Sequence, residues 1–142
     1  MSINGSVHLL PSETGLAVLD GSLAAPIALG SSVAWLDAGP DWVVVTCATM
    51  IAAGQDLHVI DEVASILDPD QSRTLARWLS ARNPSETLDR LSRSELIGDL
   101  IFDVHPSDAE DVSESRTRLI AELAELAARA ASDGLFLMIM VQ

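Results

Sequence analysis

The sequence predicts one globular domain of the α/β or α+β class, residues 1–142, in which a mixed sheet packs against helices. Its length of 142 residues suits a single domain with a substantial core. Hydrophobic residues make up 49% of the chain, which favours a packed interior over disorder. The C-terminal part shows a strand–helix–strand pattern at Asp99–Val104, Ser107–Ala131 and Leu135–Val141. We therefore expect a C-terminal β-α-β unit, with a buried last strand because that strand is apolar on both faces.

The N-terminal half predicts a hairpin, a helix and a strand. Two short apolar runs, Val7–Leu10 and Leu16–Asp20, flank the turn-like sequence PSETG and predict a β-hairpin. Helical spacing of apolar residues favours a helix over Ala25–Ala38. The β-branched, apolar run Asp41–Ala52 predicts a strand buried on both sides.

The middle of the chain is expected to be helical. The spacing of apolar residues in Gln55–Asp68 predicts one helix, and a second follows over Asp68–Arg82 with Asp68 or Asp70 as its N-cap. Pro84 or Ser85 opens a shorter helix. The long helix that starts at Ser107 is expected to end before Gly134, the usual residue at a helix C-terminus.

The net charge of −13 constrains the partners. An acidic surface repels nucleic-acid phosphates and anionic membranes, whereas it attracts a basic protein. All eight cations are arginine, which is typical of a GC-rich, bacterial coding sequence. Cys47 is the sole cysteine, and the N-terminus has no signal-peptide pattern. We therefore expect a cytoplasmic protein with a basic protein partner, and neither nucleic acid nor membrane as a ligand.

The segment Leu100–Asp111, LIFDVHPSDAED, is the strongest candidate for a metal site. Its Asp103 and His105 resemble the Asp-x-His opening of the calcineurin-like metallophosphoesterases, in which alternate strand residues reach a metal. That family needs further histidine and asparagine ligands, but neither residue occurs after His105. A helix start explains the segment more simply, with Ser107 as N-cap and Glu110 completing a capping box. A divalent-metal site at Asp103 and His105, with Asp99 and Asp108 as further ligands, is the alternative.

Other catalytic motifs are lacking in the sequence. Cys47 is a candidate nucleophile only if a histidine lies beside it, and a cysteine in an apolar run is usually a buried hydrophobe. There is no Gly-x-Ser-x-Gly elbow, and the absence of lysine excludes a phosphate-binding loop of the Walker type and Schiff-base chemistry. We therefore expect no cofactor.

The arginines gather in one part of this acidic chain. Arg73 and Arg77 share a helix face next to Trp78, and arginine and tryptophan are frequent interface anchors. We predict Trp78, Arg73 and Arg77 as partner-binding residues. The simpler interpretation is that these arginines pair with acids of the N-terminal half.

One further resemblance concerns a family of binding proteins. The sequence GLAVLDGSL, followed by a predicted helix and GPDWVVV, is similar to the start of the STAS domains of anti-sigma-factor antagonists. Those domains carry an Asp-Ser-Ser-Gly or Asp-Ser-Thr-Gly phosphorylation motif, and this chain has TCATMIAAGQD in its place. The chain is therefore not assigned to that family, although its partner-binding role agrees with the preferred function.

The preferred function is a non-enzymatic, acidic protein-interaction module: an adaptor, a regulatory subunit or an immunity-type protein that binds a basic partner. The alternative is a small metal-dependent hydrolase that uses Asp103 and His105. A structural subunit of a larger assembly is the third hypothesis, and a homo-oligomer is compatible with each of them.

Overall fold

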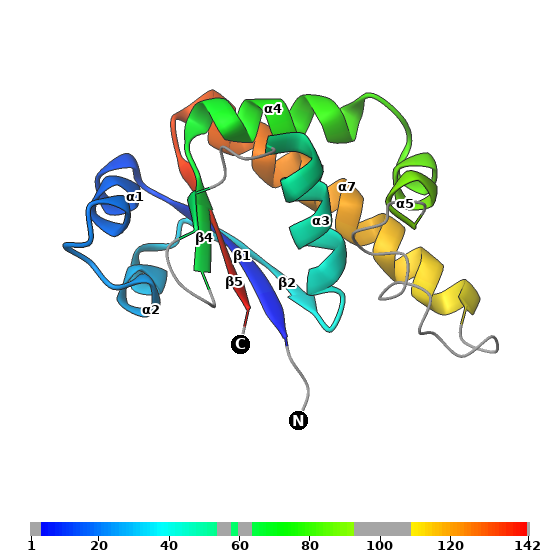
Figure 1. Cartoon of the computed structure of the whole chain (residues 1–142), viewed down its shortest axis with the longest axis horizontal. Coiled ribbons are helices and arrows are strands. Elements are labelled where there is room, and N and C mark those ends of the chain that lie inside the picture. The colour runs from blue at the N-terminus through cyan, green and yellow to red at the C-terminus, as the bar shows by residue number, and fades with distance from the viewer. Residues whose placement is uncertain (1–3, 54–57, 60–63, 93–108, 142) are drawn as a thin grey trace.

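The computed structural model describes residues 4–53, 58–59, 64–92 and 109–141, and within them it has an α+β fold (Figure 1). Five strands form one sheet in the order β2-β1-β5-β4-β3. Every strand pairing in this sheet is antiparallel. The strands are β1 Gly5–Leu10, β2 Ala34–Gly39, β3 His58–Val59, β4 Ala64–Leu67 and β5 Phe136–Val141.

The prediction of a buried last strand is confirmed by β5, which lies between β1 and β4. Leu137 and Ile139 belong to one hydrophobic core, and Phe136, Met138 and Met140 belong to the other. Because successive side chains of a strand point to opposite faces, the apolar run of β5 serves both cores. The predicted strand Asp99–Val104 lies outside the described residues, so the predicted β-α-β unit stays a prediction; the described strands contain no parallel pair.

Helices cover both faces of the sheet (Figure 1). The larger core lies under α3, α4 and α7, with α5 packed against α7 and α3. The smaller core lies under α1 and α2, which cover the other face over β4, β5 and the end of β1. The helices are α1 Ser12–Leu19, α2 Ala25–Ala28, the 3₁₀ turn η1 Leu29–Ser31, α3 Trp42–Ala53, α4 Pro69–Ser80, α5 Pro84–Ser92 and α7 Ala109–Asp133. Within the described residues, none of these helices has the length and hydropathy needed to cross a bilayer.

The predicted N-terminal hairpin is wrong. Leu16–Asp20 belongs mostly to helix α1, in which Gly15 and Val18 are buried and Leu16 is exposed. This spacing of three buries one helix face, whereas a strand would bury alternate residues. The partner of β1 is instead β2, with Val7 opposite Leu36 and His8 opposite Trp35.

The predicted helix Ala25–Ala38 is correct only at its start. The helical structure ends after η1, and the chain then forms strand β2. Glycine and serine at positions 30–32 disfavour continuation of the helix. In β2 the side chains of Trp35 and Asp37 are exposed, and Ala38 is buried where the register shifts at a bulge.

The predicted strand Asp41–Ala52 is wrong, because Trp42–Ala53 forms helix α3. A run of this length suits a helix better than a strand, and a helix buried among other helices is apolar on nearly all sides. Val44, Val45 and Ala48 are almost inaccessible to solvent. The hydroxyl of Thr49 donates to the Val45 carbonyl at 2.8 Å, a local bond that keeps this buried polar group paired.

The predicted helix Gln55–Asp68 is also wrong in its described part, which forms β3 and β4. Ala64 and Ile66 face the smaller core, whereas Leu67 faces the larger one. The alternation of a strand therefore accounts for the burial of these residues, and the helical spacing in the sequence was coincidental.

The helices predicted in the second half are confirmed. Asp68 caps α4 through its carboxylate, which accepts from the Gln71 backbone N–H at 2.8 Å, and the Gln71 side chain completes the capping box. The helix predicted at Pro84 is α5, and the long C-terminal helix is α7. Gly134 follows α7 with a φ of 68°, so it takes the left-handed position expected of glycine. The predicted cap at Ser107 lies outside the described residues.

Candidate partner-binding site

The predicted binding residues of α4 are only partly available to a partner. Arg73 and Arg77 are exposed, but Arg73 already donates to Asp70 at 2.8 Å. Trp78 is half-buried against the larger core, and the Arg82 guanidinium lies 5.0 Å from its ring centroid. The structure thus places Trp78 beside Arg82 and turns part of its ring inward. Binding by this surface stays a prediction.

A long-range ion pair of the kind expected for Arg73 and Arg77 is made by a different arginine, Arg116 of α7. Its Nε is 3.1 Å from the Asp41 Oδ1, and both side chains are largely shielded from water. Asp41 directly precedes α3, so this pair links the start of that helix to α7.

The predicted metal residues, Asp103 and His105, lie outside the described residues. Within the ranges that the structure describes, no group of three or more His, Cys, Asp and Glu side chains is arranged to hold a metal ion. The metal-dependent hydrolase therefore stays an untested alternative.

Cys47 lies in α3 with 6% of its surface exposed, and burial raises the pKa of its thiol to about 11. A thiol with that pKa is almost entirely protonated at neutral pH, and the thiolate is the nucleophilic form. The environment of Cys47 is thus that of a buried apolar residue.

Two serines lie beside His8 of β1, an arrangement that the sequence did not indicate. The Ser6 hydroxyl is 2.8 Å from the His8 Nε2, and the Ser32 hydroxyl is 3.2 Å from the His8 Nδ1. Such spacing would suit a nucleophile and its base. However, the adjacent pocket of about 260 Å³ is lined by Asp37, whose negative charge would oppose a developing oxyanion. The serines are better explained as the hydrogen-bond partners of a half-buried imidazole.

The pH dependence of stability tests this arrangement. Burial lowers the pKa of His8 below its ordinary value of 6.5, so folding favours the neutral ring. As the pH falls below 6.5, the unfolded chain takes up this proton before the folded chain does, and the free energy of unfolding decreases. We expect His8→Gln to lose less stability than the wild type between about pH 7.5 and about pH 5.5, measured by urea unfolding. Equal losses in both proteins would contradict this assignment.

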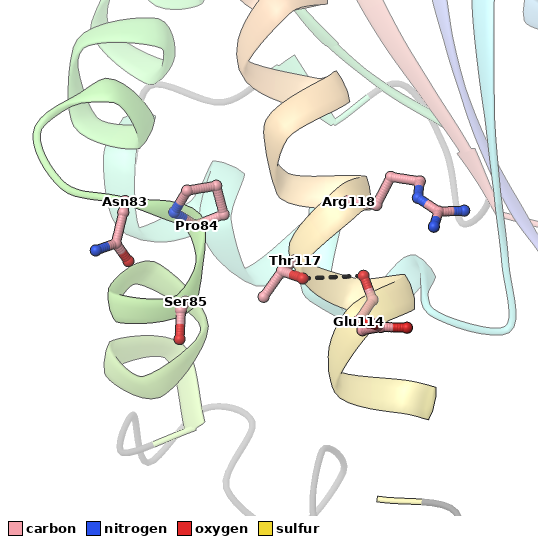
Figure 2. A pocket seen from close by; sticks show the side chains of 6 residues that line it. All are labelled: Asn83, Pro84, Ser85, Glu114, Thr117 and Arg118. Atoms are coloured by element: carbon pink, nitrogen blue, oxygen red, sulfur yellow. Dashed lines mark hydrogen bonds between the residues drawn. The ribbon is translucent and has the colours of Figure 1, made fainter. Parts of the chain in front are cut away.

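A hollow lies between the start of α5 and α7 (Figure 2). It has a volume of about 540 Å³ and is shallow. Asn83 on its rim caps α5 by accepting from the Glu86 N–H at 2.8 Å, and Thr117 donates to the Glu114 carbonyl at 2.9 Å. These hydrogen bonds therefore stabilise the two helices themselves. No large apolar side chain lines the hollow for a partner to bind.

Strand β2 provides a different surface. It is an edge strand, and within the described residues no strand pairs with its outer side. The Trp35 side chain is 70% exposed and Val33, just before the strand, is 48% exposed. Helices α1 and α2 cover neighbouring strands of the same face and leave β2 open. Large apolar side chains exposed at a sheet edge are typical of an interaction surface.

A pocket of about 280 Å³ lies between β2 and α7. Trp35 and Leu36 line it from the strand, and Glu122, Glu125, Leu126 and Arg129 line it from the helix. Consecutive strand residues point to opposite faces, so a pocket that both Trp35 and Leu36 line lies beside the outer edge of β2. We call these six residues and the strand itself the β2 edge site.

Comparison with known proteins does not add to this description: the chain matches no protein-family model, no curated protein and no solved structure. The β2 edge site was not predicted from the sequence, because Trp35 falls within the predicted helix Ala25–Ala38. The sequence carries no polar–apolar alternation that would have indicated the strand, since Asp37 is the one polar residue between Val33 and Ala38.

Proposed function

We propose that this chain is a non-enzymatic, acidic protein-interaction module, such as an adaptor, regulatory subunit or immunity-type protein, that binds a basic protein partner in the cytosol. The observation that carries the proposal is the exposed Trp35 on an edge strand, beside a pocket lined by Glu122 and Glu125. The β2 edge site is the surface that we assign to this partner.

Trp35 has the properties of an interface anchor. An exposed indole keeps a large apolar area in water, and its burial by a partner releases that area from contact with solvent. Tryptophan is enriched among the residues that contribute most to binding energy, and it acts best when nearby groups exclude water from it. Leu36 and Leu126 line the same pocket and supply apolar surroundings.

The charge supports a basic partner. The net charge of −13 produces a field that accelerates association with a cationic protein and opposes binding to nucleic acid. Because that field is screened by salt, the association rate should fall as ionic strength rises.

The test compares proteins retained from native lysate by four immobilised forms of the chain. These are the wild type, Trp35→Ser, the double variant Arg73→Gln/Arg77→Gln, and the control Leu16→Ser, which changes a leucine that is 54% exposed on α1. We expect the wild type and Leu16→Ser to retain the same basic protein, eluted by a salt gradient and identified by mass spectrometry. Trp35→Ser should lose it.

Two outcomes would contradict the proposal. Retention of the same proteins by Trp35→Ser as by the wild type would show that the β2 edge site does not bind the partner. Loss of the partner only from the α4 double variant would instead support the surface predicted at Trp78, Arg73 and Arg77.

A further inference from the structure

The backbone of β2 is as relevant to binding as its side chains. An edge strand turns every second N–H and C=O outward, and these groups can pair with another strand. Natural edges are often protected by prolines, charges or bulges. In β2 the exposed Asp37 and the bulge at Ala38 protect only the C-terminal end of the strand. The segment Ala34–Leu36 contains no proline, charged residue or bulge.

The two sides of this edge differ in chemistry. The Trp35 side chain is apolar, and it lies on the same sheet face as α1 and α2 but beyond the strands that these helices cover. The opposite face is covered by α7, whose Glu122 and Glu125 line the pocket at the edge. A strand added beside β2 would therefore direct alternate side chains toward an indole and toward carboxylates.

The carboxylates of the pocket are available for pairing. Glu122 and Glu125 are exposed and form no ion pair or hydrogen bond with other side chains among the described residues. The pocket's single cation, Arg129, is 3.6 Å from Asp133. The pocket is thus negative, and a second copy of this chain would bring the same carboxylates and its own charge of −13 against it.

We propose that β2 accepts an extended segment of a basic partner protein as an additional antiparallel or parallel strand. In this segment apolar side chains alternate with lysine or arginine: the apolar ones pack on Trp35, and the basic ones pair with Glu122 and Glu125. Backbone hydrogen bonds to β2 supply affinity, and the alternation supplies specificity. The inference rests on the proposed function, and it adds the mode of binding and the sequence pattern of the partner.

The first test uses a short, fluorescently labelled peptide of alternating valine and lysine, with blocked ends. Two control peptides have the same composition: one places all valines before all lysines, and one keeps the alternation but carries N-methyl groups on alternate backbone nitrogens. We expect the alternating peptide to bind by fluorescence anisotropy, and both controls to bind about ten-fold more weakly or not at all. Equal binding of the N-methylated peptide would overturn strand addition, and equal binding of the block peptide would overturn the alternating pattern.

The second test changes the protein. Glu122→Gln/Glu125→Gln should weaken binding of the alternating peptide about ten-fold, and Trp35→Ser about thirty-fold. Leu16→Ser should bind as the wild type does. On adding the peptide, hydrogen exchange should slow at the outward-pointing backbone amides within Ala34–Leu36, because a new strand would bond to them, whereas the inward-pointing amides already face β1.

The remaining outcomes separate this inference from the proposed function. If Trp35→Ser loses the basic protein from lysate but the amides of β2 are not protected, the partner binds there without adding a strand. The proposed function then stands and the inference fails. If the wild type instead forms dimers that Trp35→Ser abolishes, a second copy occupies the edge, and the inference is overturned.

Discussion

Leu137→Ala should lower the free energy of unfolding by about 3 kcal/mol. Leu137 is completely buried in the central strand β5. It lies opposite Leu9 of β1 and opposite Leu67 of β4, and all three leucines belong to the larger core. Truncation leaves a cavity in the middle of this row, where neighbouring strands hold the backbone and limit collapse.

Urea unfolding followed by circular dichroism measures this effect, and Leu16→Ala is the matched control. Leu16 is 54% exposed, so the same truncation should change stability by less than about 0.5 kcal/mol. Losses of similar size in the two variants would contradict the placement of β5 at the centre of the sheet.

Gly15→Ala should lower the free energy of unfolding by about 2 kcal/mol, although alanine is the better helix former. A Cβ at Gly15 would overlap the Cβ and ring of Phe136, so α1 would have to move away from β5. The Phe136 Cβ is fixed by the backbone of β5, so a change of the Phe136 rotamer does not relieve this overlap. The expected loss is therefore larger than the helical gain of about 1 kcal/mol.

Gly30→Ala is the control, because a Cβ there meets nothing within 4 Å. It should leave stability unchanged or raise it by about 0.5 kcal/mol through a less flexible unfolded chain. A double-mutant cycle with Phe136→Ala isolates the contact: without the ring, Gly15→Ala should cost far less. An unchanged penalty in that background would show that Phe136 is not the cause.

The sequence predicted the helices of the second half because their signals are local. Asp68 and Gln71 form a capping box within one turn, and Gly134 ends α7 through its own backbone preference. Spacing of apolar residues in α7 follows one helix face, as an amphipathic helix requires. Such signals do not depend on which other segment lies nearby.

The first half was predicted poorly because its secondary structure depends on tertiary contacts. The apolar, β-branched run around Val44 has the composition of a strand, but burial among α4, α5 and α7 makes it a helix. Strand β2 depends on pairing with β1, which precedes it by two short helices. The candidate site followed the same pattern: Trp35 and Glu122 are brought together by the fold, and no spacing in the sequence relates them.

The position of β5 has a consequence for how the chain acquires its fold during synthesis. Strands β1 and β4 do not pair with each other, and both pair with β5. The N-terminal segments leave the ribosome first, yet their sheet cannot be completed until the segment through Val141 has emerged. Pairing of β1 with β5 also closes a loop of nearly the whole described length, which makes folding slow compared with that of a helical bundle. In the interval β1 and β4 expose unpaired edges, so we expect the nascent chain to depend on chaperones more than its modest size suggests.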